Sequence, residues 1–227
     1  MLYLILIIAV LMLLYGPQLW VQYILNRYNR KAEENFTGTG GELARHLLDR
    51  YGLESVTVEK TELGDHYDPL SRSVRLSADK YDGRTLTAIT VAAHETGHAL
   101  QHAVKQPMFQ LRTRLAIIAV QSGKIGMLLL VSAPFLALLM RSPAAALVPV
   151  IGAFLVMGTG VIVQLITLPV ELDASFNKAL PILKQGYLRE DQFVAAQRIL
   201  RAAAWTYVAA SLASLLNFGR WLMVMRR

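Results

Sequence analysis

Two histidines four residues apart, with a glutamate directly after the first, form the most chemically suggestive group in this sequence. The stretch VAAHETGHALQH contains the pattern H-E-x-x-H at His94, Glu95 and His98. On a helix, residues four apart lie one above the other on the same face, so both imidazoles can approach one point. Tetrahedral Zn²⁺ accepts two such ligands. We therefore predict that His94 and His98 bind zinc.

Glu95 should lie beside the metal position rather than on it. It projects about 100° around the helix from His94. From there its carboxylate can accept a proton from a zinc-activated water as that water attacks a carbonyl. The pattern predicts hydrolysis with Glu95 as the general base; the alternative is a surface helix that carries these residues incidentally.

His102 continues the series of histidines but does not fit the same ion. It lies about 12 Å along the helix axis from His94, whereas Zn–N bonds are about 2.0 to 2.1 Å long. The longer pattern with a third histidine is also absent, because positions 101 and 104 are Gln and Val. We interpret His102 as a polar side chain just beyond the site.

The third ligand is predicted much further along the chain, in QLITLPVELDASFNKAL. Glu171 directly follows an apolar run, and Thr167 and Gln164 precede it on the same helical face. A carboxylate added to two histidines leaves one zinc position open for water, as catalysis requires. Asp173 is close enough to hydrogen-bond a ligating imidazole and fix its tautomer. The alternative for Glu171 is a solvated residue at a helix end.

The composition indicates a membrane protein. Of the 227 residues, 54% are apolar and 17% are charged, and the mean hydropathy is +0.39. A net charge of +7 could indicate a nucleic-acid binder, but Lys and Arg collect beside the apolar runs, as in membrane proteins. No cysteine is present, which excludes disulfides and thiolate ligands.

The apolar runs predict three or four membrane spans and five segments. Residues 1–25 form an anchor, 26–124 a water-facing domain with the HETGH helix, 125–170 a transmembrane hairpin, 171–201 the third-ligand segment, and 202–227 a C-terminal apolar helix. A soluble buried hairpin is the alternative for the third segment. The last segment either spans the membrane or lies at its interface.

The water-facing domain should be a small α+β unit. A helix is expected from Thr39-Gly-Gly-Glu42 to a stop at Gly52, and two or three short strands are expected from residue 55 to 77. The HETGH helix should then start at Asp82 or Thr85. A hairpin of spans places residues 26–124 and 171–201 on one side of the membrane, and their Lys and Arg content predicts the cytoplasmic side.

Four stretches, DHYDP, VRLS, AAHETGHALQ and LPVELDAS, together resemble the bacterial YugP-like neutral zinc metallopeptidases. More distantly, the chain is similar to the HtpX-like membrane proteases of the gluzincin group. The resemblance implies a multi-span α-helical membrane protein with a zincin-like (minigluzincin-type) cytoplasmic domain. It implies that His94, His98 and Glu171 bind zinc and that Glu95 is the catalytic base.

The resemblance also suggests how substrate is bound. In such proteases, a strand before the HExxH helix pairs with the substrate backbone, and residues 72–77 would match it. The oxyanion stabiliser is often His, Tyr or Arg in relatives. His66 and Tyr67 are the candidates here, with purely structural roles as the alternative.

We expect a zinc metalloendopeptidase of the bacterial cytoplasmic membrane that hydrolyses peptide bonds near the bilayer surface. Its partners would be a membrane-associated protein or peptide substrate and the lipid bilayer, not nucleic acid, and its oligomeric state stays open. The rival is a zinc-stabilised scaffold or peptide-binding protein without catalysis. Zinc transport is disfavoured because the first three predicted spans lack deep ionisable residues.

Overall fold

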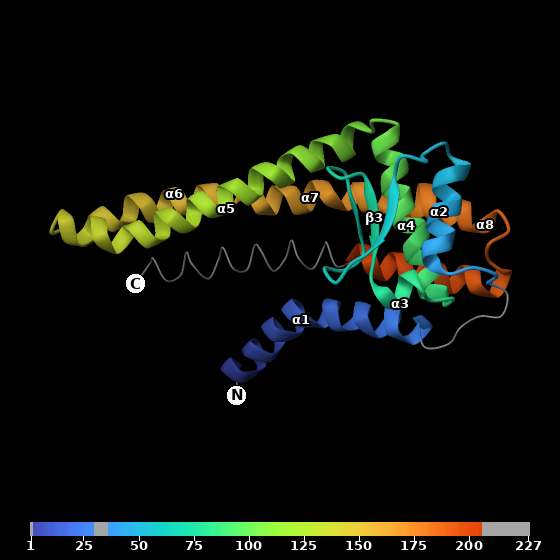
Figure 1. The fold of residues 1–227 in the computed structure, drawn as a ribbon. Helices are drawn as coiled ribbons and strands as arrows, with labels where there is room; N and C mark the ends of the chain where they lie inside the picture. The colour runs from blue at the N-terminus through green and yellow to red at the C-terminus, as the bar shows by residue number, and fades with distance from the viewer. Residues whose placement is uncertain (1, 30–35, 206–227) are drawn as a thin grey trace.

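The computed structural model describes residues 2–29 and 36–205. The fold is mostly helical, with one small sheet, and a compact domain lies at one end of a long helical hairpin (Figure 1). This agrees with the predicted combination of a mainly helical chain and a small α+β domain. The C-terminal segment after residue 205, including its predicted fourth span, lies outside the described residues.

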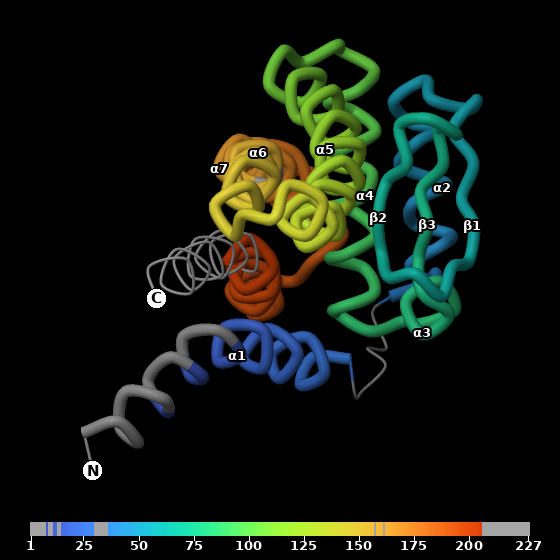
Figure 2. Tube along the Cα trace, turned by 90° about the vertical axis from the view of Figure 1, so that its left-hand side faces the viewer, coloured from blue at the N-terminus to red at the C-terminus, as the bar shows by residue number. Residues whose placement is uncertain are grey.

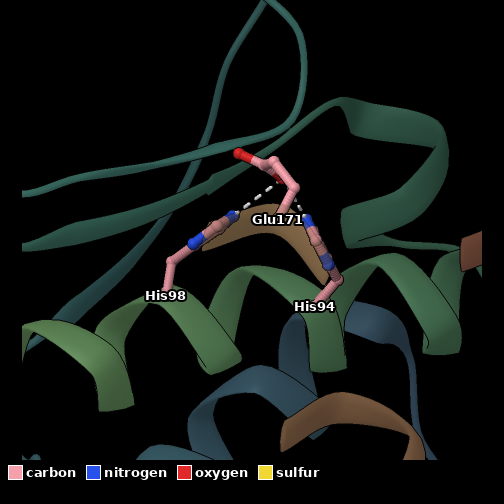
Figure 3. A group of neighbouring side chains, drawn as sticks. All are labelled: His94, His98 and Glu171. Carbon is pink, nitrogen blue, oxygen red and sulfur yellow. Dashed lines mark hydrogen bonds and ion pairs between the residues drawn. The ribbon is translucent and has the colours of Figure 1, made fainter. Parts of the chain in front are cut away.

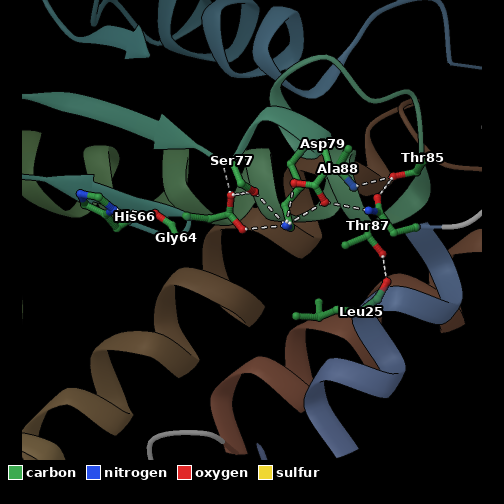
Figure 4. Close-up of polar contacts among 11 residues, drawn as sticks. Leu25, Gly64, His66, Ser77, Asp79, Thr85, Thr87 and Ala88 are labelled. Carbon is green, nitrogen blue, oxygen red and sulfur yellow. Dashed lines mark hydrogen bonds and ion pairs between the residues drawn. The ribbon is translucent and has the colours of Figure 1, made fainter. Parts of the chain in front are cut away.

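Helix α1 (Leu2–Asn29) contains Pro17, which cannot donate a backbone hydrogen bond, and the helix bends along its length (Figure 1). Its C-terminal end is fixed to the domain by two hydrogen bonds. The Thr87 hydroxyl donates to the carbonyl of Leu25 over 2.9 Å, and the Asn29 amide donates to Asp79 over 2.8 Å. Figure 4 shows the contact between Leu25 and Thr87. The predicted anchor is therefore joined to the domain.

Helix α2 (Gly40–Arg50) begins where the sequence predicts. The Thr39 side chain accepts from the backbone N–H of Glu42, and the Glu42 carboxylate accepts from the backbone N–H of Thr39, which is a complete capping box. Gly52 follows the helix with φ +70°, a left-handed conformation that glycine adopts at little cost.

The sheet has three strands, where two or three were predicted: β1 (Thr57–Lys60), β2 (His66–Asp68) and β3 (Ser73–Leu76). Their order is β1-β3-β2. Val58 pairs with Val74 in parallel, and Tyr67 pairs with Val74 in the antiparallel direction. The central strand is therefore β3, and β2 forms an edge.

A short helix, α3 (Ala78–Tyr81), precedes the long helix α4 (Leu86–Ala103), which carries the HETGH motif. The Thr85 hydroxyl accepts from the backbone N–H of Ala88 and caps α4, so the helix starts at the later of the two predicted positions. Helix α4 lies between the sheet on one side and helical segments on the other (Figure 2). Its central position buries most of its side chains.

The loop before β2 is fixed to α3 by partly buried polar contacts (Figure 4). Asp65 accepts from the backbone N–H of Ser77 over 2.7 Å and forms an ion pair with Lys80 over 3.1 Å. Lys80 also contacts Asp79, the partner of Asn29 in α1. The edge strand and α1 are thus connected through one polar network.

The predicted hairpin is present. It consists of α5 (Pro107–Leu139), the turn η1 (Pro143–Ala146), and the successive helices α6 (Leu147–Met157) and α7 (Thr159–Leu172), which lie beside α5 (Figure 1). Among the described residues, only α5 is long and apolar enough to cross a membrane, and almost none of that window is buried against protein.

Three or four spans therefore stay a prediction. Helix α5 also continues without interruption past residue 124, where the sequence placed the end of the water-facing domain.

After α7, the chain continues through a π-helical segment, η2 (Asp173–Ala179), and α8 (Leu180–Lys184), and residues 190–205 are helical. Apolar residues of α2, α4, α8 and residues 190–205 form one core. A second core joins the sheet to α4, with Phe109 of α5 and Val170 of α7. Through this second core, α4 is packed against the end of the hairpin.

Candidate metal centre

Three buried side chains from two distant segments meet between α4 and α7. The Glu171 Oε2 atom lies 3.1 Å from His94 Nε2 and 3.3 Å from His98 Nε2 (Figure 3). One ligand atom from each residue falls within 4.8 Å of the other two. All three side chains are buried. The structure thus brings together the residues that the sequence selected as metal ligands.

The donor set fits a zinc ion. Two imidazole nitrogens and one carboxylate oxygen are common zinc ligands, and three protein ligands leave a fourth position open. The other carboxylate oxygen of Glu171, Oε1, is buried and has no hydrogen-bond partner. A buried carboxylate oxygen without a partner is costly, and a metal ion would compensate it.

The charge of the cluster also suits a cation. Burial alone would raise the pKa of Glu171, but His98 and the hydrogen bonds from both histidines bring this pKa well below its usual value. Glu171 is therefore ionised at neutral pH. An ionised carboxylate next to two imidazoles provides a site for a divalent ion.

Both histidines are oriented by hydrogen bonds at Nδ1, which leave Nε2 directed at the centre. His94 Nδ1 lies 3.1 Å from the Ser175 hydroxyl, and His98 Nδ1 lies 2.9 Å from the Gln101 side-chain oxygen. Metal binding requires the form in which Nδ1 donates in these contacts and Nε2 carries a lone pair, so the ion would replace the hydrogen that each Nε2 gives to Glu171.

Gln101, like Ser175, is a partner of the clustered histidines that the sequence did not reveal. It is fully buried, and its side-chain amide donates to the Val170 carbonyl over 2.9 Å and to Asp173 over 2.8 Å. Asp173 therefore reaches His98 through Gln101, instead of contacting an imidazole directly as the sequence suggested. The sequence signal for Gln101 was its position three residues after His98, on the same face of a helix expected to be buried.

Replacing Gln101 with Met is expected to lower zinc affinity by about 10-fold to 100-fold, which is typical when the partner of a ligating histidine is removed. Methionine has a similar volume but cannot hold the His98 ring through Nδ1. Chelator competition on the purified protein measures the change. Gln197→Met is the matched control, and equal affinities in the two variants would show that Gln101 does not orient His98.

Gly97 allows α4 to approach η2 closely, behind the ligands. A Cβ atom at this position would lie 2.9 Å from the backbone oxygen of Ala174 and 3.3 Å from the Cβ atom of Lys178. The first contact is with backbone, which cannot move aside independently. The small residue inside HETGH therefore fixes the distance between the helix with the histidines and the segment that follows Glu171.

Gly97→Ala is expected to destabilise the protein by about 1 to 3 kcal/mol, because the added methyl group overpacks this contact. Thermal unfolding of the purified full chain measures the loss. Gly123→Ala on α5 is the control, since a Cβ atom there meets nothing within 4 Å. A melting temperature for Gly97→Ala that equals or exceeds the control's would contradict close packing at this contact.

Glu95 is buried beside the cluster. Burial raises its pKa to about 7, with a further contribution from Glu171, while His94 and the backbone N–H of Tyr67 act in the opposite direction. A carboxyl group whose pKa lies near neutrality can both accept and return a proton. This is the property that a general base at this position requires.

Arg112 on α5 brings a positive charge to the same place. Its Nη2 atom lies 3.9 Å from Glu171 Oε1, and its side chain is 26% exposed, so it contacts the cluster and is partly open to solvent. The sequence reasoning did not select it, because nothing local distinguishes it from other arginines near the apolar run.

His66 and Tyr67 are both in β2, but their side chains do not join the cluster. His66 Nδ1 lies 2.8 Å from the Gly64 carbonyl, and the Tyr67 hydroxyl lies 2.8 Å from His102 Nδ1. Only the main chain of Tyr67 reaches the centre, through its contact with Glu95. Their assignment as oxyanion stabilisers stays a prediction, and Arg112 is a further candidate.

One expectation about substrate binding is wrong. Residues 72–77 were expected to pair with the substrate backbone, but β3 (Ser73–Leu76) is already paired on both sides, with β1 and with β2. Its backbone donors and acceptors are therefore used within the sheet. The sequence could not show this, because strand order is set by tertiary packing and not by alternation along one strand.

Two buried histidines and a buried glutamate, with a second glutamate beside them and an apolar helical hairpin adjoining, form a donor set that fits a zinc-binding protein. The chain belongs to the family described as "Putative neutral zinc metallopeptidase", whose model matches residues 3–226. It is 38% identical over 233 residues to "Putative membrane protease YugP" of Bacillus subtilis (strain 168), a match that covers 99% of this chain and 96% of that protein. No solved structure matches the chain.

These comparisons confirm the resemblance to the YugP-like family, and they confirm zinc as the cofactor at the level of the family. His94, His98 and Glu171 are the group that could hold the metal ion. The name of the relative suggests membrane association, and so does α5, the one helix among the described residues that is long and apolar enough to cross a membrane.

Proposed function

We propose that this protein is a zinc-dependent endopeptidase that cleaves membrane-associated proteins or peptides close to the bilayer surface. The observation that carries the proposal is the buried cluster of His94, His98 and Glu171, with the buried carboxyl group of Glu95 beside it. The family and the relative named a membrane protease support the same activity.

Zinc, when bound, supplies a Lewis acid that polarises a substrate carbonyl and acidifies a water molecule. His94 and His98 direct Nε2 toward the Glu171 carboxylate because Ser175 and Gln101 form hydrogen bonds with the opposite ring nitrogen, Nδ1. Glu95 accepts a proton from the attacking water and returns it to the leaving amine nitrogen. Arg112 is positioned to stabilise negative charge that develops on the carbonyl oxygen.

The substrate backbone would bind along the free edge of β2 (His66–Asp68). This strand pairs with β3 on one side, and within the described ranges no strand pairs with its other side. The main-chain N–H of Tyr67 reaches Glu95. A peptide added as a further strand would therefore run past the catalytic groups, which is a common mode of peptide recognition.

The location of the site supports a substrate at the membrane. Glu171 belongs to the last turn of α7, which packs along α5, the helix long enough to span the bilayer. Large apolar side chains on α5 are exposed, including Leu128, Phe135 and Leu138, as expected for contact with lipid. We propose a multi-pass arrangement with the site on the cytoplasmic side, as the distribution of Lys and Arg suggests.

The function is tested by quantitative proteomics of membranes from cells that contain either the wild type or Glu95→Gln. The proposal predicts protein fragments that accumulate only with the wild type and whose new ends fall within juxtamembrane segments. Identical fragment patterns at equal protein levels would instead favour the zinc-stabilised scaffold, which binds metal without cleaving.

A further inference from the structure

A pocket of about 480 Å³ lies next to the metal centre, beyond the C-terminal side of His98. Its walls come from α4, the first turns of α5, strand β2, and the loops before β1 and β3. Two of its residues also contact the site. The ring of Phe109 lies 6.1 Å from that of His98, and Tyr67 reaches Glu95 with its main chain. A peptide lying along β2 would therefore present a side chain to this pocket.

The rim of the pocket is positively charged. Arg72, Lys105 and Arg114 line it, while no aspartate or glutamate does. All three cations are exposed, and none forms an ion pair with another residue in the part of the chain that the structure describes. The pocket thus presents positive charge that no ion pair among the described residues neutralises.

Two of these cations occupy backbone positions that favour other residues. Arg72 has φ +52° and Lys105 has φ +51°. Both values fall in the left-handed region, where glycine or asparagine would be less strained. Lys105 follows the end of α4, a position at which glycine is the common choice.

His102 adds a hydrogen-bond donor to the pocket. Burial raises the pKa of Tyr67 to about 12, so its hydroxyl is protonated and needs an acceptor. The nearest one is His102 Nδ1, at 2.8 Å. Burial and the charge of Arg72 lower the pKa of His102, which keeps its ring neutral. A neutral ring that accepts at Nδ1 carries its hydrogen on Nε2, and no residue in the described ranges accepts it.

The floor of the pocket is apolar and aromatic. Phe109 is almost completely buried, and Val56 and Ala99 lie nearby. Such a floor accommodates methylene groups, while the rim and His102 suit a carboxylate. We propose that the pocket receives an aspartate or glutamate side chain of the substrate, within two residues of the cleaved bond. This inference rests on the proposed peptidase function and names its substrate preference.

The test uses the full-length, zinc-loaded protein in detergent and a peptide library made by digesting a bacterial proteome. Mass spectrometry of the products identifies the cleaved bonds, and the inference predicts enrichment of Asp and Glu at one position beside them. Quenched fluorescent peptides that differ only there, with Glu, Gln or Lys, then give kcat/KM. We expect the Glu peptide to exceed the Gln peptide by about tenfold.

Two double variants test whether the pocket causes the preference. Lys105→Glu with Arg114→Glu is expected to make the Lys peptide the best substrate. Lys105→Gln with Arg114→Gln should remove the Glu preference while the Gln peptide is still cleaved. This uncharged double variant keeps the test valid if the double Glu variant does not fold. Arg84→Glu, an exposed cation outside the pocket, is the matched control and should retain the preference.

The outcomes separate the inference from the proposed function. Cleavage by the wild type without acidic preference, or a preference unchanged in both double variants, would overturn the inference and leave the peptidase function intact. Absence of any cleavage by the zinc-loaded wild type would refute the proposed function and, with it, this inference.

Discussion

Replacing Glu95 with Gln is expected to lower kcat by about 10² to 10⁴-fold or more, with an unchanged zinc content. The amide keeps the shape of the side chain but cannot accept a proton from water. Because Glu95 is not one of the three clustered ligand residues, the metal should stay bound. Steady-state cleavage of a peptide found in the library, together with metal analysis of the same sample, measures both effects.

Glu62→Gln is the matched control for this prediction, because Glu62 is exposed and lies in the loop between β1 and β2. The control should keep wild-type kcat. Two results would contradict the assignment of Glu95 as general base: full activity of the purified Glu95→Gln variant, or loss of zinc in parallel with loss of activity.

Replacing Glu171 with Gln should lower zinc affinity by more than about 100-fold. Loss of a hydrogen-bond partner behind a ligand already costs 10-fold to 100-fold, and here a charged ligand itself is replaced. Hydrolysis should fall with zinc occupancy, and excess zinc should restore it only in part. Chelator competition and activity at several zinc concentrations measure these two quantities.

Glu54→Gln, an exposed glutamate before β1, controls for the change in net charge and should bind zinc like the wild type. Glu171→Gln with wild-type zinc affinity would remove Glu171 from the ligand set. The ion would then need another carboxylate or histidine, which the described part of the chain does not place in the cluster.

The two ligands on α4 could be predicted because helical geometry is local. Once residues 86–103 form a helix, a spacing of four residues places His94 and His98 on one face. Glu171 could also be predicted, although 73 residues separate it from His98. A carboxylate at the end of an apolar run is costly unless protein or metal compensates it.

Contacts between elements could not be predicted in the same way. The interposition of Gln101 between His98 and Asp173 depends on how α4 packs against the π-helical segment after Glu171. The approach of Arg112 depends on the angle at which α5 leaves α4. The order of the strands is likewise a property of the assembled sheet. It places β3 in the centre and leaves β2, not β3, with an unpaired edge among the described residues.

His102 illustrates both the strength and the limit of the sequence analysis. Geometry along one helix correctly separated it from the metal ligands, since its ring contacts Tyr67 and Phe109 instead. The sequence then left His102 only the role of a polar side chain just beyond the site. Only the fold shows that this ring lines a cationic pocket next to the site.

The most direct test of the account is a structure of the zinc-loaded full chain, by crystallography with data at the zinc absorption edge. We predict one zinc ion about 2.0 to 2.2 Å from His94 Nε2, His98 Nε2 and a carboxylate oxygen of Glu171, with the fourth position open to solvent. A zinc ion bound elsewhere, or one enclosed by four protein ligands, would contradict a catalytic centre at this cluster.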